Sequence, residues 1–201
     1  MKKIILASNN KHKIEEFRSI FADCEVLALK DIGFNGEIVE DGKTFVENSL
    51  IKARTVFIFI KEKGIVASVI ADDSGLCVPA LNGEPGIHSA RYSGDHDDKA
   101  NRNKLLKKLL NKKDRTAYFS CTLVELFSES DYIIAEGRTY GTISKEEKGK
   151  TDFGYDCLFL SDDLGKTFGE ATSEEKNSVS HRGRAIEKLK VLRNERERIN
   201  L

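Results

Sequence analysis

The feature that most constrains the fold is an apolar, β-branched run at residues 65–71, followed at once by Asp72-Asp73-Ser74-Gly75. Such a run predicts a buried strand that stops at the two carboxylates. In open α/β sheets, ligands bind beyond the carboxyl ends of strands. Adjacent side chains on a strand point to opposite faces, so a shared role for both carboxylates requires a turn at Ser74-Gly75. Taken alone, the motif is more typical of a solvated turn.

The rest of the chain alternates between strand-like and helix-like segments. Further strands are predicted at residues 3–7, 25–29, 116–127, 132–143 and 157–160. Helices are predicted from the Asn9-Asn10 cap to Phe21, and at residues 44–63, 97–113 and 182–199; in the third, Leu105, Leu106, Leu109 and Leu110 are expected to face inward. The connection 77–94 holds both prolines and is expected to be a loop, which at this length is usually functional or disordered. This alternation is typical of an α/β domain.

Composition excludes several classes of protein. Lys+Arg and Asp+Glu each number 33 among 201 residues, so no net charge favours nucleic acid or an anionic membrane as a partner. The four cysteines are widely spaced, with no C-x-x-C pair, so we expect reduced, mostly buried thiols. The N-terminal apolar run is too short for a signal peptide, and no segment approaches a membrane span. We therefore expect a cytoplasmic protein.

A polar segment between the first strand and the first helix is suited to phosphate binding. It comprises Ser8, Asn9, Asn10, Lys11, His12 and Lys13. Such a junction offers free backbone N–H groups and the positive end of the helix dipole, and Lys13 adds a mobile cation. The glycines of a Walker loop are missing. Capping asparagines and solvated lysines are the commoner explanation of these residues alone.

Carboxylates in two segments are candidates for a metal site. Glu47 follows Thr44 at the spacing of a capping box, which by itself is a structural role. If the start of this helix faces Asp72 and Asp73, three carboxylates could hold Mg²⁺, which prefers one or two protein carboxylates with water and phosphate oxygens. Lys52 could reach the same place, although an exposed helical lysine is the simpler interpretation.

A second group of candidates lies in the last quarter of the chain. Phe153-Gly154-Tyr155-Asp156 offers aromatic rings and a glycine that allows close approach, which suits a stacked base. Lys176, His181 and Arg182 supply cations before the last helix, and Arg182 suits a phosphate or a carbonyl acceptor. Core-packed aromatics and an exposed basic turn would explain the same residues without a ligand.

Six motifs occur in order nearly from end to end of the chain. They are Ile5-Leu6-Ala7-Ser8-Asn9-Asn10 with Lys13; Thr44-Phe45-x-Glu47-Asn48 with Lys52-Ala53-Arg54; Ala71-Asp72-Asp73-Ser74-Gly75-Leu76; Pro85-Gly86-Ile87-x-Ser89-Ala90-Arg91-Tyr92-Ser93-Gly94; Phe153-Gly154-Tyr155-Asp156; and Glu175-Lys176 with Ser180-His181-Arg182-Gly183. Together they resemble the inosine triphosphate pyrophosphatase family, the diphosphatases of non-canonical purine nucleotides such as XTP, ITP and dITP.

The resemblance implies a fold, a reaction and a set of site residues. The fold would be an elongated α/β protein with a mixed sheet, flanking helices and two lobes around a central cleft, the lobes being roughly residues 1–113 with 150–201, and 114–149. The protein would be a homodimer that cleaves a nucleoside triphosphate to monophosphate and pyrophosphate with Mg²⁺, or with Mn²⁺. Residues 8–13 would hold phosphates, Glu47 and Asp73 the metal, and Asp73 would also accept the proton. Substrate contacts would come from Ser74, Phe153, Gly154, Tyr155, Asp156, Lys176, His181 and Arg182, with Asp72 and Lys52 in support.

This chain departs from the family pattern at two places. Ser8-Asn9-Asn10 stands where Thr-Gly-Asn is more common, and the base loop has Thr151-Asp152 before it and Cys157 after it where the family has glycines and a proline. Two other functions therefore stay open: a module that senses triphosphates without cleaving them, and a pyrophosphatase with a different base preference.

Overall fold

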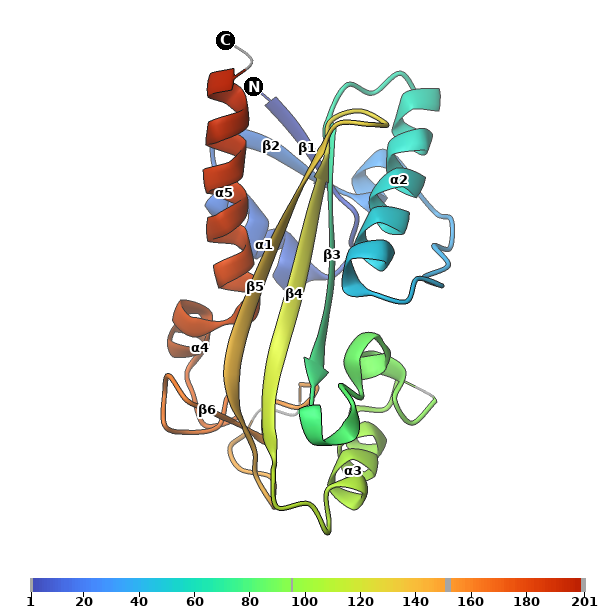
Figure 1. Cartoon of the computed structure of the whole chain (residues 1–201). Coiled ribbons are helices and arrows are strands. Elements are labelled where there is room, and N and C mark those ends of the chain that lie inside the picture. The colour runs from blue at the N-terminus through green and yellow to red at the C-terminus, as the bar shows by residue number, and fades with distance from the viewer. Residues whose placement is uncertain (1, 95, 151–152, 200–201) are drawn as a thin grey trace. The chain divides into compact units, whose positions relative to one another are not determined.

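The computed structural model of the chain contains a mixed sheet with strand order β2-β1-β3-β4-β5-β6 and helices flanking it (Figure 1). It describes residues 2–94, 96–150 and 153–199, and only the backbone at position 12. β1 runs parallel to both β2 and β3, whereas β5 and β6 are antiparallel. The predicted α/β class with a mixed sheet is therefore confirmed.

The elements follow the expected alternation closely. The strands are β1 (Lys2–Leu6), β2 (Cys24–Ala28), β3 (Ser68–Cys77), β4 (Thr116–Leu126), β5 (Tyr132–Ile143) and β6 (Phe159–Ser161). The α-helices are α1 (Lys11–Ile20), α2 (Phe45–Glu62), α3 (Asp98–Lys108), α4 (Ser173–Val179) and α5 (His181–Ile199). Short 3₁₀ helices occupy Leu29–Ile32, Pro79–Leu81 and Gly86–Arg91, so the predicted loop at 77–94 carries some local helical structure.

The chain divides into two compact units, each with its own apolar core. Unit 1 comprises residues 1–73, 122–135 and 189–201, and unit 2 comprises residues 74–121 and 136–188. The core of unit 1 includes Ile5, Val56 and Val69, and that of unit 2 includes Leu105, Phe159 and Phe168. The four cysteines, Cys24, Cys77, Cys121 and Cys157, are buried and form no disulfide, as predicted.

In unit 1, β1, α1 and β2 form a parallel crossover that explains where the helices lie. Asn10 caps α1 through its side chain, which accepts a hydrogen bond from the Lys13 N–H at 3.2 Å. Ile14, Phe17 and Phe21 are buried, as their helical spacing predicts. Thr44 caps α2 in the same way, its hydroxyl accepting from the Glu47 N–H at 3.1 Å. Both helices thus begin where the sequence places their caps.

Two sequence predictions about individual elements are wrong, and one helix was not predicted. The third strand does not stop at Asp72 and no turn occurs at Ser74-Gly75, since β3 continues to Cys77. Leu110 is 78% exposed because α3 ends at Lys108 before the helical repeat reaches it. The helix α4, capped by Thr172 and Glu175, was not expected at all, because it is only 7 residues long and none of its residues is buried.

In the part of the chain that the structure describes, no helix combines the length and the apolar character that crossing a membrane requires.

Candidate functional site

The first group of candidate residues lies in unit 1, where the strand order reverses direction. From β1 the chain reaches β2 on one side of it and β3 on the other, which makes the β1–β3 edge a topological switch point. β1 ends at Leu6, opposite Ile70, and the Ala7 N–H donates to the Ile70 carbonyl at 2.8 Å. Residues 8–13 and the Asp72-Asp73 pair therefore come together at the carboxyl end of β1, the place where open α/β sheets bind ligands.

The candidate residues lie at the carboxyl end of β1, whereas β3 continues past this point to Cys77. Because β3 continues beyond its paired neighbour, Asp72 and Asp73 remain on a regular strand and point to opposite faces of the sheet. Asp72 faces α1, where both of its carboxylate oxygens accept from the Lys13 ammonium at 2.9 and 2.7 Å. Asp73 faces α2, where its Oδ2 accepts from Asn48 Nδ2 at 2.9 Å. The expected sharing of one role by the two carboxylates is therefore wrong.

The buried Asp72 carboxylate holds the Lys13 ammonium in place. Its side chain is 2% exposed, and that of Lys13 is 23% exposed. A buried carboxylate is costly unless it is paired and hydrogen-bonded, and Lys13 supplies both. An ammonium group has three N–H donors, so Lys13 retains capacity for a third acceptor such as a phosphate oxygen.

Asp73 is surrounded by side chains of α2. Asn48, which is 1% exposed, accepts from the Gly42 N–H at 2.9 Å while donating to Asp73. The Lys52 ammonium lies 3.9 Å from Asp73 Oδ1 and donates to Glu40 at 2.7 Å. Lys52 is thus a charged neighbour of Asp73 and not the exposed lysine of the simpler interpretation.

Glu47 sits in the first turn of α2, next to Asn48. Its Oε2 accepts from the Lys43 N–H at 2.5 Å, one residue before the position that a capping box uses. Among the described residues, no group of three or more acidic, histidine or cysteine side chains is arranged to hold a metal ion. The predicted cluster of three carboxylates is therefore absent, because Asp72 faces α1. Glu47 and Asp73 are left as the candidate pair on the α2 side.

The start of α1 supplies polar groups beside Asp72. Ser8 Oγ accepts from the Asn10 N–H at 3.1 Å, and Asn9 Oδ1 accepts from the Lys30 N–H at 3.1 Å. Asn9, Asn10 and Lys11 are exposed, and the His12 side chain lies outside the described part of the chain. The asparagines do cap structure, as the simpler interpretation held, but they do so at the switch point.

The second group of candidates lies in unit 2, on the loop at 153–156. Phe153 is 61% exposed, whereas Tyr155 is 4% exposed and its hydroxyl donates to the Ser89 carbonyl at 2.8 Å. Burial raises the pKa of the Tyr155 phenol, so the hydroxyl remains a donor. Only Phe153 therefore offers a ring face to a ligand, while Tyr155 anchors the loop. Thr151 and Asp152 lie outside the described residues.

Asp156 of this loop forms an ion pair with Lys176 of α4, in which the Asp156 side chain is 5% exposed and that of Lys176 is 24% exposed. The Lys176 ammonium donates to Asp156 Oδ2 and also lies 5.4 Å from the centre of the Phe153 ring. Burial raises the pKa of the Asp156 carboxyl, while the charges of Lys176 and Arg182 act in the opposite direction. The structure thus brings Phe153, Asp156, Lys176 and Arg182 into one group.

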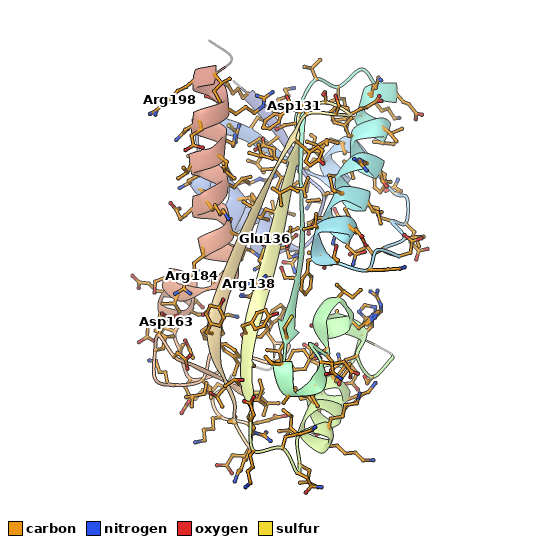
Figure 2. The ribbon with its side chains drawn as sticks, in the orientation of Figure 1. Asp131, Glu136, Arg138, Asp163, Arg184 and Arg198 are labelled. Atoms are coloured by element: carbon orange, nitrogen blue, oxygen red, sulfur yellow. The ribbon has the colours of Figure 1, made fainter. Side chains whose placement is uncertain are left out.

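The beginning of α5 is fixed by a close approach to β5. The His181 ring stacks on Phe119 with their centroids 5.0 Å apart. A Cβ on Gly137 of β5 would lie 2.1 Å from the His181 carbonyl oxygen and 2.3 Å from the Ala185 nitrogen. In the same turn of the helix, Arg184 donates to the Arg138 carbonyl at 2.8 Å and to Asp163 at 2.9 Å; Figure 2 labels these three residues. Only glycine permits this packing of His181 and Arg182 against the sheet.

Ser74 is the first residue of unit 2 and follows Asp73 along β3. It is partly exposed. The sequence prediction missed Asn48 and Gly137. Asn48 donates a hydrogen bond to Asp73, and Gly137 permits the close approach of the helix that carries His181 and Arg182. Asn48 stands inside a quoted motif, so its position carried a signal, whereas Gly137 is one glycine among 15 and carried none.

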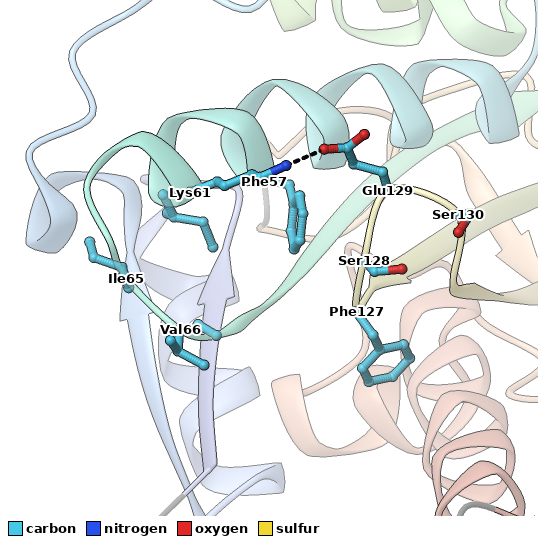
Figure 3. Close-up of a pocket in the computed structure, with 10 residues that line it drawn as sticks. Phe57, Lys61, Ile65, Val66, Phe127, Ser128, Glu129 and Ser130 are labelled. Atoms are coloured by element: carbon cyan, nitrogen blue, oxygen red, sulfur yellow. Dashed lines mark hydrogen bonds and ion pairs between the residues drawn. The ribbon is translucent and has the colours of Figure 1, made fainter.

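Unit 1 also contains a hollow of about 420 Å³ that none of these candidates lines (Figure 3). Its walls are mainly apolar and include Phe57, Ile65 and Phe127, and the Lys61 ammonium donates to Glu129 across it at 2.6 Å. The hollow lies beside the residues that precede β3 and the turn between β4 and β5. It is therefore separate from the switch point, at which Asp72 and Asp73 lie.

Comparison with known proteins identifies the family. A family model described as the Ham1 family matches residues 4–192. The chain belongs to the Ham1 family. It is similar to the solved structure of the Staphylococcus aureus Ham1 protein, with a TM-score of 0.88 and 39% identity, covering 97% of this chain and 100% of that one. A HAM1 protein from Coxiella burnetii gives a TM-score of 0.89 at 36% identity, with the same coverage of 97% and 100%.

Curated relatives of this Ham1 chain carry a functional name. A "dITP/XTP pyrophosphatase" of Clostridium perfringens is 49% identical over 196 residues, which cover 94% of this chain and 96% of the relative. A protein of the same name from Leuconostoc mesenteroides is 44% identical over 193 residues, covering 93% and 94% of the two chains. The family expected from the six motifs is thereby confirmed.

Proposed function

We propose that this protein hydrolyses non-canonical purine nucleoside triphosphates, XTP, ITP and dITP, to the monophosphate and pyrophosphate, and so removes them from the nucleotide pool. The similarity to proteins named dITP/XTP pyrophosphatase over nearly the whole of both chains carries the proposal. The switch point of unit 1 supports it, because it gathers cationic and carboxylate side chains of the kind that phosphoryl chemistry requires.

The residues of unit 1 would bind and orient the triphosphate. The N–H groups at the start of α1 and the Lys13 ammonium would neutralise phosphate charge. Asp72 would keep Lys13 in position, and Lys52 would add charge beside Asp73. Asp73 would accept the proton of the attacking water, and Asn48 would fix the orientation of its carboxylate.

The carboxylates on the α2 side fit a magnesium ion. Mg²⁺ is commonly bound through one or two carboxylates, waters and substrate phosphates, which matches the pair Glu47 and Asp73. Each carboxylate has two oxygens, so Glu47 can accept the Lys43 N–H through Oε2 and bind a metal through the other. When bound, Mg²⁺ or Mn²⁺ would stabilise negative charge on the phosphates. The homodimer and the cytoplasmic location stay predictions.

The group in unit 2 would recognise the base. The exposed Phe153 ring offers a stacking surface, and Arg182 offers fixed donors. Hypoxanthine and xanthine carry a carbonyl acceptor where adenine carries an amino donor, so a fixed donor favours the former. Ser74, Lys176 and His181 would make the remaining contacts with substrate.

Product analysis tests the proposal directly. The purified protein is incubated with Mg²⁺ and ITP, XTP, dITP, ATP or GTP, and pyrophosphate and orthophosphate are measured separately. Pyrophosphate from the first three, with ATP nearly untouched, is the expected result. Orthophosphate as the product would contradict the proposed bond cleavage, and thermal stabilisation by ITP without any product would favour a nucleotide sensor.

Asp73→Asn tests the proposed proton acceptor. We expect turnover of ITP to fall by roughly 10²–10⁴-fold, the usual contribution of a positioned general base, while the fold survives because the amide can still accept from Asn48. The circular dichroism spectrum and the denaturation midpoint control for folding. Near-normal turnover in a folded variant would rule the role out.

Arg182→Ala tests the basis of selectivity. We expect the ratio of kcat/KM for ITP to that for ATP to fall by about tenfold, the value of one hydrogen bond to a charged group. The exposed Lys188→Ala, on the same helix, is the matched control. If the ratio is unchanged in Arg182→Ala, another residue reads the base.

A further inference from the structure

Two side chains of α3 hydrogen-bond to the main chain of the loop at 153–156, one to the N–H and one to the carbonyl of Gly154. Asp98, in the first turn of α3, accepts from the Gly154 N–H through Oδ2 at 2.7 Å. Arg102, one turn further along the same face, donates from Nη1 to the Gly154 carbonyl at 3.0 Å. All the residues concerned belong to unit 2. Two successive peptide groups of the loop are therefore fixed by two side chains whose spacing the helix sets.

The burial of Arg102 indicates that this contact is specific. Its side chain is 3% exposed, although the helix around it is rich in exposed lysines, and its Nε donates to Glu147 at 2.8 Å. A buried guanidinium is costly unless its donors are satisfied by a counter-charge and hydrogen bonds. The planar fork of arginine lets one group bond to Glu147 and another to Gly154, which an ammonium on a flexible stem does less well.

The conformation of Gly154 explains why the loop needs support. Its φ is +55°, in the left-handed region that glycine adopts without strain but does not by itself prefer. The following residue, Tyr155, is anchored through its hydroxyl to Ser89. With the main chain fixed at Gly154 and Tyr155, the Phe153 ring stays exposed in one place.

We propose that Asp98 and Arg102 are positioning residues for substrate recognition: they hold Gly154 so that Phe153 and Asp156 are pre-arranged for the purine base. The inference rests on the proposed function of the loop. In this role both residues act through Gly154, so they would lower the cost of ordering the loop when the base binds.

The first test is kinetic. In Asp98→Ala the acceptor for the Gly154 N–H is lost, and we expect KM for ITP to rise about tenfold with kcat within about twofold, because the proton acceptor in unit 1 is untouched. Asp98→Asn retains an oxygen acceptor and is expected to restore most of the affinity. Lys99→Ala, at an exposed neighbour on α3, controls for truncation of a charged side chain at the surface of this helix. Equal losses in Asp98→Ala and Asp98→Asn, or a loss confined to kcat, would overturn the inference.

The second test needs no substrate and separates this inference from the proposed function. Hydrogen exchange of the Gly154 amide is expected to accelerate by about tenfold or more in Asp98→Ala, while the Gly169 amide, which donates to the Asp156 carbonyl, exchanges as before. An unchanged Gly154 amide would overturn the inference even if the wild type releases pyrophosphate. If the wild type releases none, the proposed function fails, and the exchange result still decides whether Asp98 holds the loop.

Arg102→Lys is the second variant if Asp98→Ala does not fold. It keeps the charge but loses the fork, so we expect a similar rise in KM with most of the stability retained. A KM equal to that of the wild type in a folded Arg102→Lys protein would remove Arg102 from the proposal.

Discussion

The candidate residues of the two units are held in different ways. In unit 1, Lys13, Asp72, Asn48 and Asp73 lie on or next to regular elements, and each is fixed by another side chain. In unit 2, the loop at 153–156 is irregular, and its main chain is held by side chains of a helix more than fifty residues earlier. The first group is thus placed by side chains of regular elements that pair with one another, whereas the second depends on side chains that hold the main chain of an irregular loop. Substitutions in unit 1 should act through pairs of charges, and those in unit 2 through the backbone.

Gly137→Ala should give the largest effect on stability, and it tests whether close backbone contacts hold the candidate residues of unit 2 in place. The added Cβ would overlap main-chain atoms of α5, which cannot rotate away, so we expect a loss of about 3 kcal/mol in the free energy of unfolding. Denaturant titration measures it. Glu136→Ala, the exposed neighbour on β5 that Figure 2 labels, should change stability by less than about 0.5 kcal/mol. Equal effects of the two changes would mean that α5 is not fixed by this approach.

Lys13→Met should give a smaller effect and tests the charge pair in unit 1. The change removes the Lys13 charge from the buried Asp72 carboxylate, and we expect a loss of about 2 kcal/mol in the free energy of unfolding, below the usual value for a buried pair because Lys13 is 23% exposed. Denaturant titration of the double variant Lys13→Met/Asp72→Asn should recover at least half of this loss. Additive losses in the double variant would show that the two groups are not coupled.

The pH dependence of stability should show the smallest effect and concerns Asp156. Burial raises its pKa in the folded protein above the usual 3.8, so the folded state binds more protons than the unfolded state between the two values. Asp156 therefore contributes stability that is fully present below pH 3.8 and is lost as the pH rises through the folded pKa.

Asp156→Asn removes this titration. The stability of the wild type relative to the variant should fall with rising pH across that window, by less than about 1.4 kcal/mol per pH unit, and denaturant titrations of both proteins at a series of pH values measure the difference. If the stability of the wild type relative to Asp156→Asn rises with pH, the charge of Lys176 outweighs burial in setting the pKa of Asp156.

Much of the fold was predictable because it is encoded locally. The alternating pattern of β5 gave the limits 132–143, and the caps Asn10 and Thr44 gave the starts of α1 and α2. The prediction for Asp72 and Asp73 located the right segment but assumed a turn. The pairing of β3 with β1 ends where β1 ends, so the position of the candidate residues depends on the length of β1. No local pattern in residues 65–75 contains that information.

The parts of the site that were missed depend on long-range packing. The residues around Arg102 have the composition of an exposed helix. Arg102 is nevertheless buried, because the loop at 153–156 lies against it. Gly137 is required by the approach of a helix that begins at His181. Such contacts join segments far apart in the sequence, so neither helical periodicity nor residue type predicts them.

The four buried cysteines give the chain built-in reporters of local opening. Cys24 belongs to unit 1, and Cys77, Cys121 and Cys157 belong to unit 2. Burial raises the pKa of the Cys24 and Cys77 thiols, which keeps them protonated and unreactive while the structure around them is closed. A thiol reagent therefore modifies each cysteine at the rate at which its surroundings open. Because the reporters are divided between the units, labelling followed by mass spectrometry reveals whether the two units open together or one before the other.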